Sequence, residues 1–273
     1  MKQVKYKLIA VDMDGTLLND ESMITERTKS AVISAIEMGI LFVVSTGRSM
    51  TALKNIKNSD VLIENDMPLI LFNGANVITG KSQKRLFSSS LQADYVKQIY
   101  NFGVDRNTPV IIWIGEQLWV SHDCEAVQDY QRMSGAEINI INDIDIDEFK
   151  SAEASKMLWI DEPDNIRRYQ QEMSEYFNRS INCHISKPEL LEFVSAEASK
   201  GNAMREIGKI YGIDRSEMIA VGDSYNDVSM LEYAGFSVAM QNAPDDIKAI
   251  CKYVTLSNND DGVAAAIDKF ILM

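Results

Sequence analysis

Cysteine and histidine are scarce in this chain. Of its 273 residues, three are cysteines and two are histidines. The cysteines, Cys124, Cys183 and Cys251, are scattered and odd in number, and no pair has Cys-x-x-Cys spacing. This excludes a disulfide framework and predicts free thiols in a reducing cytoplasm. His122 and His184 lie near two of the cysteines, but we expect them to be ordinary packing residues and not zinc ligands.

Long hydrophobic runs and an excess of positive charge are also missing. No apolar stretch reaches the ~18 residues that a membrane-spanning helix requires. The first twelve residues, MKQVKYKLIAVD, lead directly into a short apolar strand pattern and do not resemble a secretory signal. We therefore predict a cytoplasmic protein with no membrane partner. The net charge is −13, which argues against nucleic acid as a partner, because phosphate backbones require a basic face.

The chain is otherwise typical of a soluble globular protein, with 46% hydrophobic and 25% charged residues. Short, continuous apolar runs alternate with helical patterns at both ends of the chain. Strands are predicted at 6–11, 40–44, 68–72, 218–221 and 236–240, and helices at 25–38, 200–211, 225–233 and 262–271. Strands separated by helices predict a parallel sheet, and continuous apolarity predicts that both faces are covered. The predicted fold class is therefore α/β, with a Rossmann-like core.

The middle of the chain has a different pattern. Strand pairs are predicted at 110–114 with 118–121 and at 180–185 with 189–194, mixed with helical stretches. Hairpins mixed with helices indicate an α+β unit inserted into the outer α/β domain. We place the outer core at residues 1–84 and 189–273, and the inserted unit at residues 85–188.

Two acids follow the first predicted strand. The segment VDMDGTLLND places Asp12 and Asp14 one residue apart, followed by Gly15. Ligands of open α/β sheets bind beyond the carboxyl ends of the strands, and period-two alternation would point both carboxylates the same way. A shared divalent cation would neutralise the pair, and oxygen ligands favour Mg²⁺. Taken alone, the segment could also be a polar turn, because Asp-Gly is a common turn sequence.

A second acidic cluster follows the predicted strand at 218–221. The segment GDSYND places Asp223 and Asp227 four residues apart, at the same edge of the predicted sheet. Helix capping explains one acid at such a position but not two acids with an Asn. Lys200 opens a helix nearby, where its charge opposes the helix dipole and a neighbouring anion would compensate. A surface position for Lys200 is the alternative, since most lysines are exposed.

Two other strand ends carry polar residues. Thr46 and Gly47 follow the second strand, where a hydroxyl and a backbone N–H could bind a phosphate; a plain helix cap would look the same. Asn73 and Gly74 end the third strand. They could be a turn, or they could place a polar group at the rim of a site.

These motifs occur in the order that is found in the haloacid dehalogenase-like superfamily. DMDGT, the STGR of Ser45–Arg48, the lysine before Gly201 and GDSYND carry the resemblance, which covers nearly the whole chain. The large insert between STGR and Lys200 resembles the Cof-type phosphatase branch, whose members carry an inserted α/β (C2-type) cap. The branch often has alanine in place of Ser45 and valine in place of Ala198. Neither departure touches a residue that is expected to perform chemistry.

The resemblance implies a Mg²⁺-dependent phosphatase of small phosphorylated metabolites, such as sugar phosphates. Asp12 would be the nucleophile that forms an aspartyl phosphate, and Asp14 the general acid and base. The implied metal ligands are Asp12, the backbone carbonyl of Asp14, and Asp223, with Asp227 holding a metal-bound water or orienting Asp223. The cap would act as a lid. The implied phosphate-binding residues are Met13 (backbone N–H), Thr46, Gly47, Lys200 and Asn226, and the candidate substrate-rim residues are Arg48, Asn73 and Gly74.

The sequence leaves two alternative functions open. The first is a phosphosugar mutase of the same superfamily, which would need cations in the cap to bind a second phosphate. Suitable cations are present at Arg106, Arg132, Lys156, Arg167 and Arg168. The second is a non-enzymatic phospho-acceptor or sensor module. Asp14 argues against this module, because a general base next to an aspartyl phosphate would shorten its lifetime.

Overall fold

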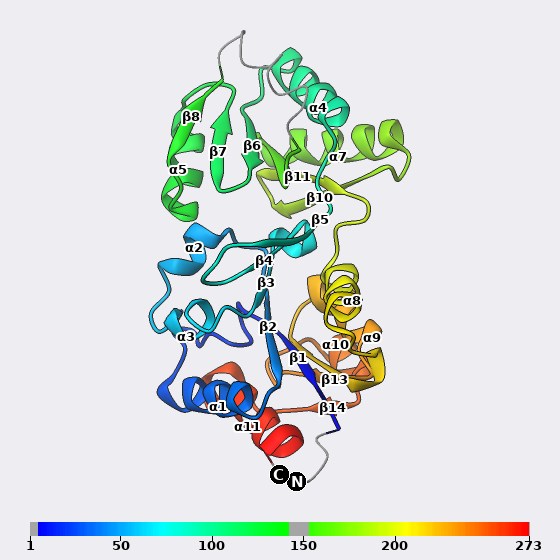
Figure 1. The fold of residues 1–273 in the computed structure, drawn as a ribbon. Helices are drawn as coiled ribbons and strands as arrows, with labels where there is room; N and C mark the ends of the chain where they lie inside the picture. Colours follow the sequence, from blue (N-terminus) through cyan, green and yellow to red (C-terminus); the bar gives the residue numbers. More distant parts are fainter. Residues whose placement is uncertain (1–4, 142–152, 273) are drawn as a thin grey trace. The chain divides into compact units, whose positions relative to one another are not determined.

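The computed structural model describes residues 5–141 and 153–272. The chain forms two compact units (Figure 1). The first comprises Met1–Arg48, Leu53–Ser88 and Ser199–Met273, and the second Ser49–Ala52 and Ser89–Ala198. The predicted insert of residues 85–188 stays our proposal for the domain division. The second unit extends to Ala198 because the strand after residue 188 pairs within its sheet.

An eight-stranded sheet forms the centre of the first unit, with the order β14-β13-β12-β1-β2-β3-β4-β5. Neighbouring strands from β14 to β3 are parallel, and β4 and β5 add antiparallel strands at one edge. The predicted α/β class with a mainly parallel sheet is confirmed. The strands are β1 (Leu8–Asp12), β2 (Leu41–Ser45), β3 (Pro68–Leu71), β4 (Asn76–Thr79), β5 (Arg85–Ser88), β12 (Met218–Gly222), β13 (Phe236–Ala239) and β14 (Tyr253–Val254).

Helices and short helical turns connect these strands. Thr25 caps the first helix, because its hydroxyl accepts a hydrogen bond from the N–H of Thr28 at 3.1 Å. The helix predicted at 225–233 consists of a 3₁₀ turn followed by a short α-helix. The elements are α1 (Glu26–Glu37), α2 (Met50–Lys54), α3 (Asp60–Ile63), η1 (Phe72–Gly74), α8 (Lys200–Tyr211), η3 (Arg215–Glu217), η4 (Tyr225–Asp227), α9 (Val228–Tyr233), α10 (Asp245–Ile250), η5 (Asn258–Asp260), α11 (Gly262–Ile267) and η6 (Asp268–Leu272).

The core of the first unit explains why its strands are continuous apolar runs. All five residues of β1 are buried, so both faces of the strand are covered. Leu8 and Ala10 belong to a cluster that includes Met204 and Ile207 of α8 and Met230 of α9. This packing fixes the position of β1 and of the start of α8 on which the candidate site depends.

The second unit is an α+β structure built on a six-stranded sheet, with the order β10-β11-β9-β6-β7-β8. Its core includes Trp159 of β9, Ile99 of α4 and Ile166 of α7, all fully buried. The strands are β6 (Val110–Ile114), β7 (Gln117–Val120), β8 (Ile138–Ile140), β9 (Lys156–Ile160), β10 (Ile181–Lys187) and β11 (Leu190–Ser195), and the helices are α4 (Ala93–Asp105), α5 (Glu125–Ser134) and α7 (Pro163–Phe177).

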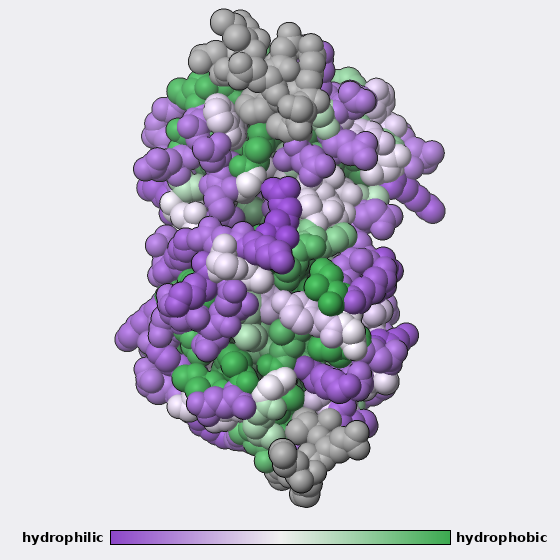
Figure 2. All heavy atoms as spheres, in the orientation of Figure 1, coloured by the Kyte–Doolittle hydropathy of each residue, from purple (hydrophilic) through white to green (hydrophobic). Residues whose placement is uncertain are grey.

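The visible surface is mainly hydrophilic, with smaller hydrophobic patches (Figure 2). Among the residues that the structure describes, no helix combines the length and the hydrophobicity needed to cross a membrane.

Candidate active site

Polar residues follow four neighbouring parallel strands of the first unit. In the order β12, β1, β2 and β3, the strands end at or within two residues of Asp223, Asp12, Thr46 and Asn73. The register of β1 and β12 pairs Val11 with Val221. Strands from the N-terminal and C-terminal parts of the sequence are therefore neighbours, and their carboxyl ends lie side by side. Carboxyl ends of adjacent parallel strands form the usual ligand-binding edge of an open α/β sheet.

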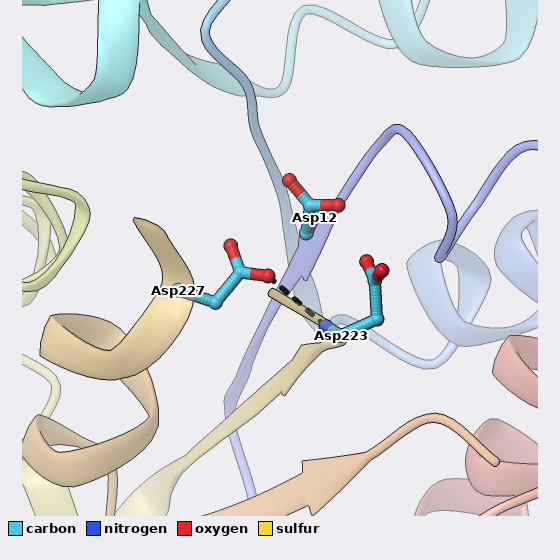
Figure 3. Close-up of side chains that lie close together, drawn as sticks. All are labelled: Asp12, Asp223 and Asp227. Atoms are coloured by element: carbon cyan, nitrogen blue, oxygen red, sulfur yellow. Dashed lines mark hydrogen bonds between the residues drawn. The ribbon is translucent and has the colours of Figure 1, made fainter. Parts of the chain in front are cut away.

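Three carboxylates converge at this edge. One oxygen of each of Asp12, Asp223 and Asp227 lies within 4.8 Å of the others. Figure 3 shows Asp12 between the other two side chains, which come from the loop and turn after β12. Asp12 and Asp227 are buried and Asp223 is half-buried. The structure therefore brings together three of the four predicted metal-binding residues through their side chains.

Both carboxylate oxygens of Asp227 accept hydrogen bonds from other groups of the protein. Its Oδ2 accepts hydrogen bonds from the backbone N–H groups of Asp223 and Ser224, both at 3.0 Å. Its Oδ1 lies 2.6 Å from Nζ of Lys200. These contacts fix the loop that carries Asp223, and they favour the second of the two roles expected for Asp227, which is to orient Asp223.

Lys200 is completely buried at the first position of α8. Its ammonium contacts the carboxylates of both Asp12 and Asp227. The alternative of a surface lysine is therefore wrong, and the anions expected near this helix start are these two acids. Burial lowers the pKa of Lys200, but the two carboxylates outweigh this effect and hold the pKa above its usual value.

The charges of the cluster fit a divalent cation. Burial raises the pKa of Asp12 above its usual value, more than Lys200 lowers it. Burial also raises the pKa of Asp223, against a hydrogen bond from Thr16. Three carboxylates face one ammonium, so a dication would balance the excess negative charge. The donor set is oxygen only, which suits a hard cation such as Mg²⁺ or Ca²⁺.

Asp14 lies apart from this cluster. Its carboxylate accepts two hydrogen bonds from Arg48, from Nε at 2.9 Å and from Nη2 at 2.6 Å. Its side chain is 54% exposed, whereas Asp12 is buried. The strand ends at Asp12 and the chain turns immediately, so the extended segment on which the expected alternation rests does not reach Asp14. The bidentate contact orients the Asp14 carboxylate and raises the pKa of Arg48.

Thr16 was not among the predicted site residues, yet it holds Asp223. Its Oγ1 donates a hydrogen bond to Oδ1 of Asp223 at 2.7 Å. Gly15 permits this approach, since a Cβ at this position would lie 2.6 Å from Oδ2 of Asp223. Gly15 also has a φ of +80°, which side chains rarely adopt. The Gly-Thr pair directly after the two acids was the sequence feature that could have indicated this contact.

Replacing Gly15 with alanine is expected to displace Asp223. We expect Gly15→Ala to reduce the affinity of the acid cluster for a divalent cation such as Mg²⁺ at least about tenfold, since the new methyl group competes for the space of a carboxylate oxygen. Gly39→Ala is the matched control, because Gly39 has a φ of +84° but a Cβ at this position would meet no neighbouring atom within 4 Å. Both variants carry the same backbone strain, so equal losses of Mg²⁺ affinity in the two would contradict the role of Gly15.

The remaining predicted residues lie in the first unit, in the loops and turns that follow β1, β2, β3 and β12. Thr46 is buried, and its backbone N–H donates a hydrogen bond to the carbonyl oxygen of Ile70 at 2.8 Å. Its Oγ1 accepts the N–H of Arg48 at 3.1 Å. The side chain of Met13 is completely buried. Asn226 is exposed and donates from Nδ2 to Oδ1 of Asn73 at 3.2 Å.

Comparison with known proteins identifies the family. The model of the haloacid dehalogenase-like hydrolases matches residues 9–267. The chain belongs to this family. The resemblance stated from the motifs is thereby confirmed, and with it the prediction of a phosphoric monoester hydrolase of the haloacid dehalogenase-like type.

Relatives of this haloacid dehalogenase-like hydrolase match along nearly the full chain. YxeH of Bacillus subtilis (strain 168) is 31% identical over 271 residues, which cover 98% of this chain and 99% of the relative. The 5-amino-6-(5-phospho-D-ribitylamino)uracil phosphatase YwtE of the same strain is 28% identical, with 97% and 98% covered. The crystal structure of a haloacid dehalogenase-like hydrolase from Bacteroides thetaiotaomicron is 28% identical, with 97% and 99% covered and a TM-score of 0.86.

Proposed function

We propose that this hydrolase is a Mg²⁺-dependent phosphatase that acts on small phosphorylated metabolites, such as sugar phosphates, through an aspartyl-phosphate intermediate. The observation that carries the proposal is the buried Asp12 carboxylate, which lies against the Lys200 ammonium and within reach of a cation shared with Asp223. YwtE, a full-length relative, is named for a phosphorylated ribityl compound, which supports a small phosphate ester as the substrate class.

The metal ion would be held by Asp12, by the backbone carbonyl of Asp14 and by Asp223. When bound, Mg²⁺ neutralises charge on the phosphoryl oxygens and on the carboxylates around it. Thr16 fixes one oxygen of Asp223, and Asp227 fixes the backbone of the same loop. These contacts hold Asp223 in place before any ligand arrives, which reduces the reorganisation needed at binding.

Asp12 is the proposed nucleophile and Asp14 the proposed general acid and base. A carboxylate oxygen of Asp12 attacks phosphorus in line while the bond from phosphorus to the ester oxygen breaks, and Asp14 gives its proton to the departing alcohol. Asp14 then takes a proton from the water that attacks the aspartyl phosphate. This second step releases inorganic phosphate and restores Asp12. One acid serves both steps, because the two steps require opposite protonation states.

Lys200, Thr46, Gly47 and Asn226 are the proposed phosphate-binding residues, together with the backbone N–H of Met13. An ammonium carries three donors, and two of those of Lys200 face Asp12 and Asp227. The third donor is the one that we propose contacts a phosphoryl oxygen next to the nucleophile. Phosphoryl transfer depends mainly on such positioning and charge stabilisation.

Ion pairs in the second unit favour hydrolysis over the mutase alternative. Each of the five cations that could bind a second phosphate lies within 4 Å of a carboxylate: Arg106 and Arg168 of Glu172, Arg132 of Asp129, Lys156 of Glu192 and Arg167 of Asp164. A second phosphate would have to compete with these acids. The lid role of the inserted unit stays a prediction.

A panel of phosphate esters assayed with and without Mg²⁺ tests the proposal. We expect inorganic phosphate to be released from sugar phosphates and aryl phosphates in the presence of Mg²⁺. Chelation with EDTA should reduce the rate at least about 100-fold, and added Mg²⁺ should restore it. An isomerised ester without release of phosphate would indicate the mutase instead. A long-lived phosphorylated chain without turnover would indicate the sensor module.

A further inference from the structure

The turn after β3 has an unusual backbone. Phe72, Asn73 and Gly74 have successive φ angles of 51°, 55° and 106°. A positive φ is common for glycine and tolerated by asparagine, but it is a true outlier for a bulky aromatic residue. Phe72 is also almost completely buried, at 2% exposure. Such strained backbone persists only where surrounding structure imposes it, and it concentrates at functional sites.

Contacts on both sides impose this conformation. The N–H of Phe72 donates to Arg48 O at 3.2 Å, and the N–H of Asn73 donates to Thr46 O at 2.9 Å. On the other side, a Cβ on Gly74 would lie 2.2 Å from the carbonyl oxygen of Ser199, the residue before Lys200. The turn is therefore held between the loop after β2 and the start of α8, and both of these carry proposed phosphate-binding residues.

The strained turn presents the amide of Asn73 to the proposed phosphate-binding residues. A Cβ on Gly47 would lie 3.1 Å from Nδ2 and 3.2 Å from Oδ1 of Asn73, so glycine at position 47 leaves room for the whole amide. Oδ1 of Asn73 accepts the hydrogen bond from Asn226. Among the residues that the structure describes, no partner accepts a hydrogen bond from Nδ2, and Asn73 is only half-buried.

We propose that Asn73 is a phosphate-binding residue, whose Nδ2 donates a hydrogen bond to a phosphoryl oxygen bound between Gly47 and Asn226. This inference rests on the proposed function, because it adds a donor to the same site. The orientation of the amide follows from its hydrogen bond: once Oδ1 accepts from Asn226, Nδ2 is the atom left to face an anion. The backbone strain then has a purpose, since it holds this donor where a relaxed turn would not.

Two substitutions separate a donor from a residue that only shapes the turn or orients Asn226. Asn73→Asp keeps an acceptor for Asn226 and tolerates the positive φ, but it replaces the donor with a carboxylate oxygen. Asn73→Gly removes the side chain and suits the backbone conformation. Asn178→Gly is the control, because Asn178 also has a positive φ of 43° but caps α7 in the second unit.

The probe is inorganic phosphate, titrated calorimetrically against the full chain in the presence of Mg²⁺. We expect Asn73→Gly to weaken phosphate binding by about 10- to 100-fold, the value of one hydrogen bond to a charged group. Asn73→Asp should weaken it at least as much, because like charges repel. The melting temperature of Asn73→Gly should not fall, and Asn178→Gly should bind phosphate like the wild type.

Phosphate affinity within about twofold of the wild type in Asn73→Gly would overturn the inference. Near-wild-type phosphate affinity in Asn73→Asp would also overturn the inference, because this variant lacks the Nδ2 donor and keeps only the acceptor for Asn226. Failure of the proposed function is a different result. In that case the wild type would release no phosphate from esters, while the dependence of phosphate affinity on Asn73 could still be measured, since binding requires no turnover.

Discussion

Asp12→Asn is expected to lose at least about 10³-fold in turnover while the fold survives. The amide has the shape of the carboxylate but cannot attack phosphorus, and it removes one negative charge from the metal cluster. Lys200 keeps Asp227 as a partner at 2.6 Å, so its ammonium stays paired. The measurement is kcat with an aryl phosphate and Mg²⁺, alongside circular dichroism of both proteins.

Asp245→Asn is the control for the change from acid to amide. Asp245 is fully exposed at the first turn of α10, so this variant should retain wild-type turnover. Trapping after rapid acid quench should find a phosphorylated chain in the wild type and none in Asp12→Asn. Turnover near the wild-type value in Asp12→Asn would show that Asp12 is not the nucleophile.

The strands and their polar ends could be predicted because they depend on local sequence. The five strands predicted for the outer core agree with β1, β2, β3, β12 and β13 within two residues at either end. Continuous apolar runs require burial of both faces of the strand. Acids directly after such runs lie at the carboxyl ends of the strands, where open α/β sheets bind their ligands. The meeting of Asp12 and Asp223 then follows from the order of strands in a parallel sheet.

The side-chain contacts of the site could not be predicted, because they depend on register and on turns between distant segments. The sequence gives no measure of which residue the Asp14 carboxylate contacts, and its hydrogen bonds from Arg48 span 34 positions along the chain. The same holds for the contact of Thr16 with Asp223. Phe72 has no local preference for a positive φ, so its conformation arises from the packing around it.

Lys200→Met is expected to be the most destabilising single change in the first unit. The variant leaves Asp12 and Asp227 buried without their cation, and breaking a buried ion pair in this way costs about 3–5 kcal/mol. The loss should be largest in EDTA, because Mg²⁺ would partly replace the missing positive charge. Amide hydrogen exchange of β1 and β12 measures it, since these strands lie in the first unit.

Lys156→Met provides the matched comparison in the second unit. Lys156 pairs with Glu192 at 3.2 Å, and both side chains are nearly buried. We expect a similar loss of stability. The fluorescence of the three tryptophans, Trp113, Trp119 and Trp159, measures the unfolding of this unit. Because no part of the acid cluster is in this unit, Mg²⁺ should not restore the stability of Lys156→Met. Equal recovery of both variants by Mg²⁺ would contradict the assignment of the metal to Asp12 and Asp223.

The destabilisation by Lys200→Met should also depend on pH in a defined direction. Burial raises the pKa of Asp12 in the folded state even when Lys200 is present, and removing the ammonium raises it further. A carboxyl group with a raised folded-state pKa binds more protons when folded than when unfolded, so stability falls as the pH rises above its unfolded value of about 4. With a folded-state pKa of about 8 in the wild type and a higher one in the variant, Asp12 stays protonated in both folded proteins below that pH. In EDTA, the difference in unfolding free energy between the wild type and Lys200→Met should therefore be nearly constant between about pH 5 and pH 7 and grow above about pH 8. A difference that stays constant above about pH 8 would mean that Lys200 does not neutralise Asp12, and the charge balance on which the metal site depends would have to be revised.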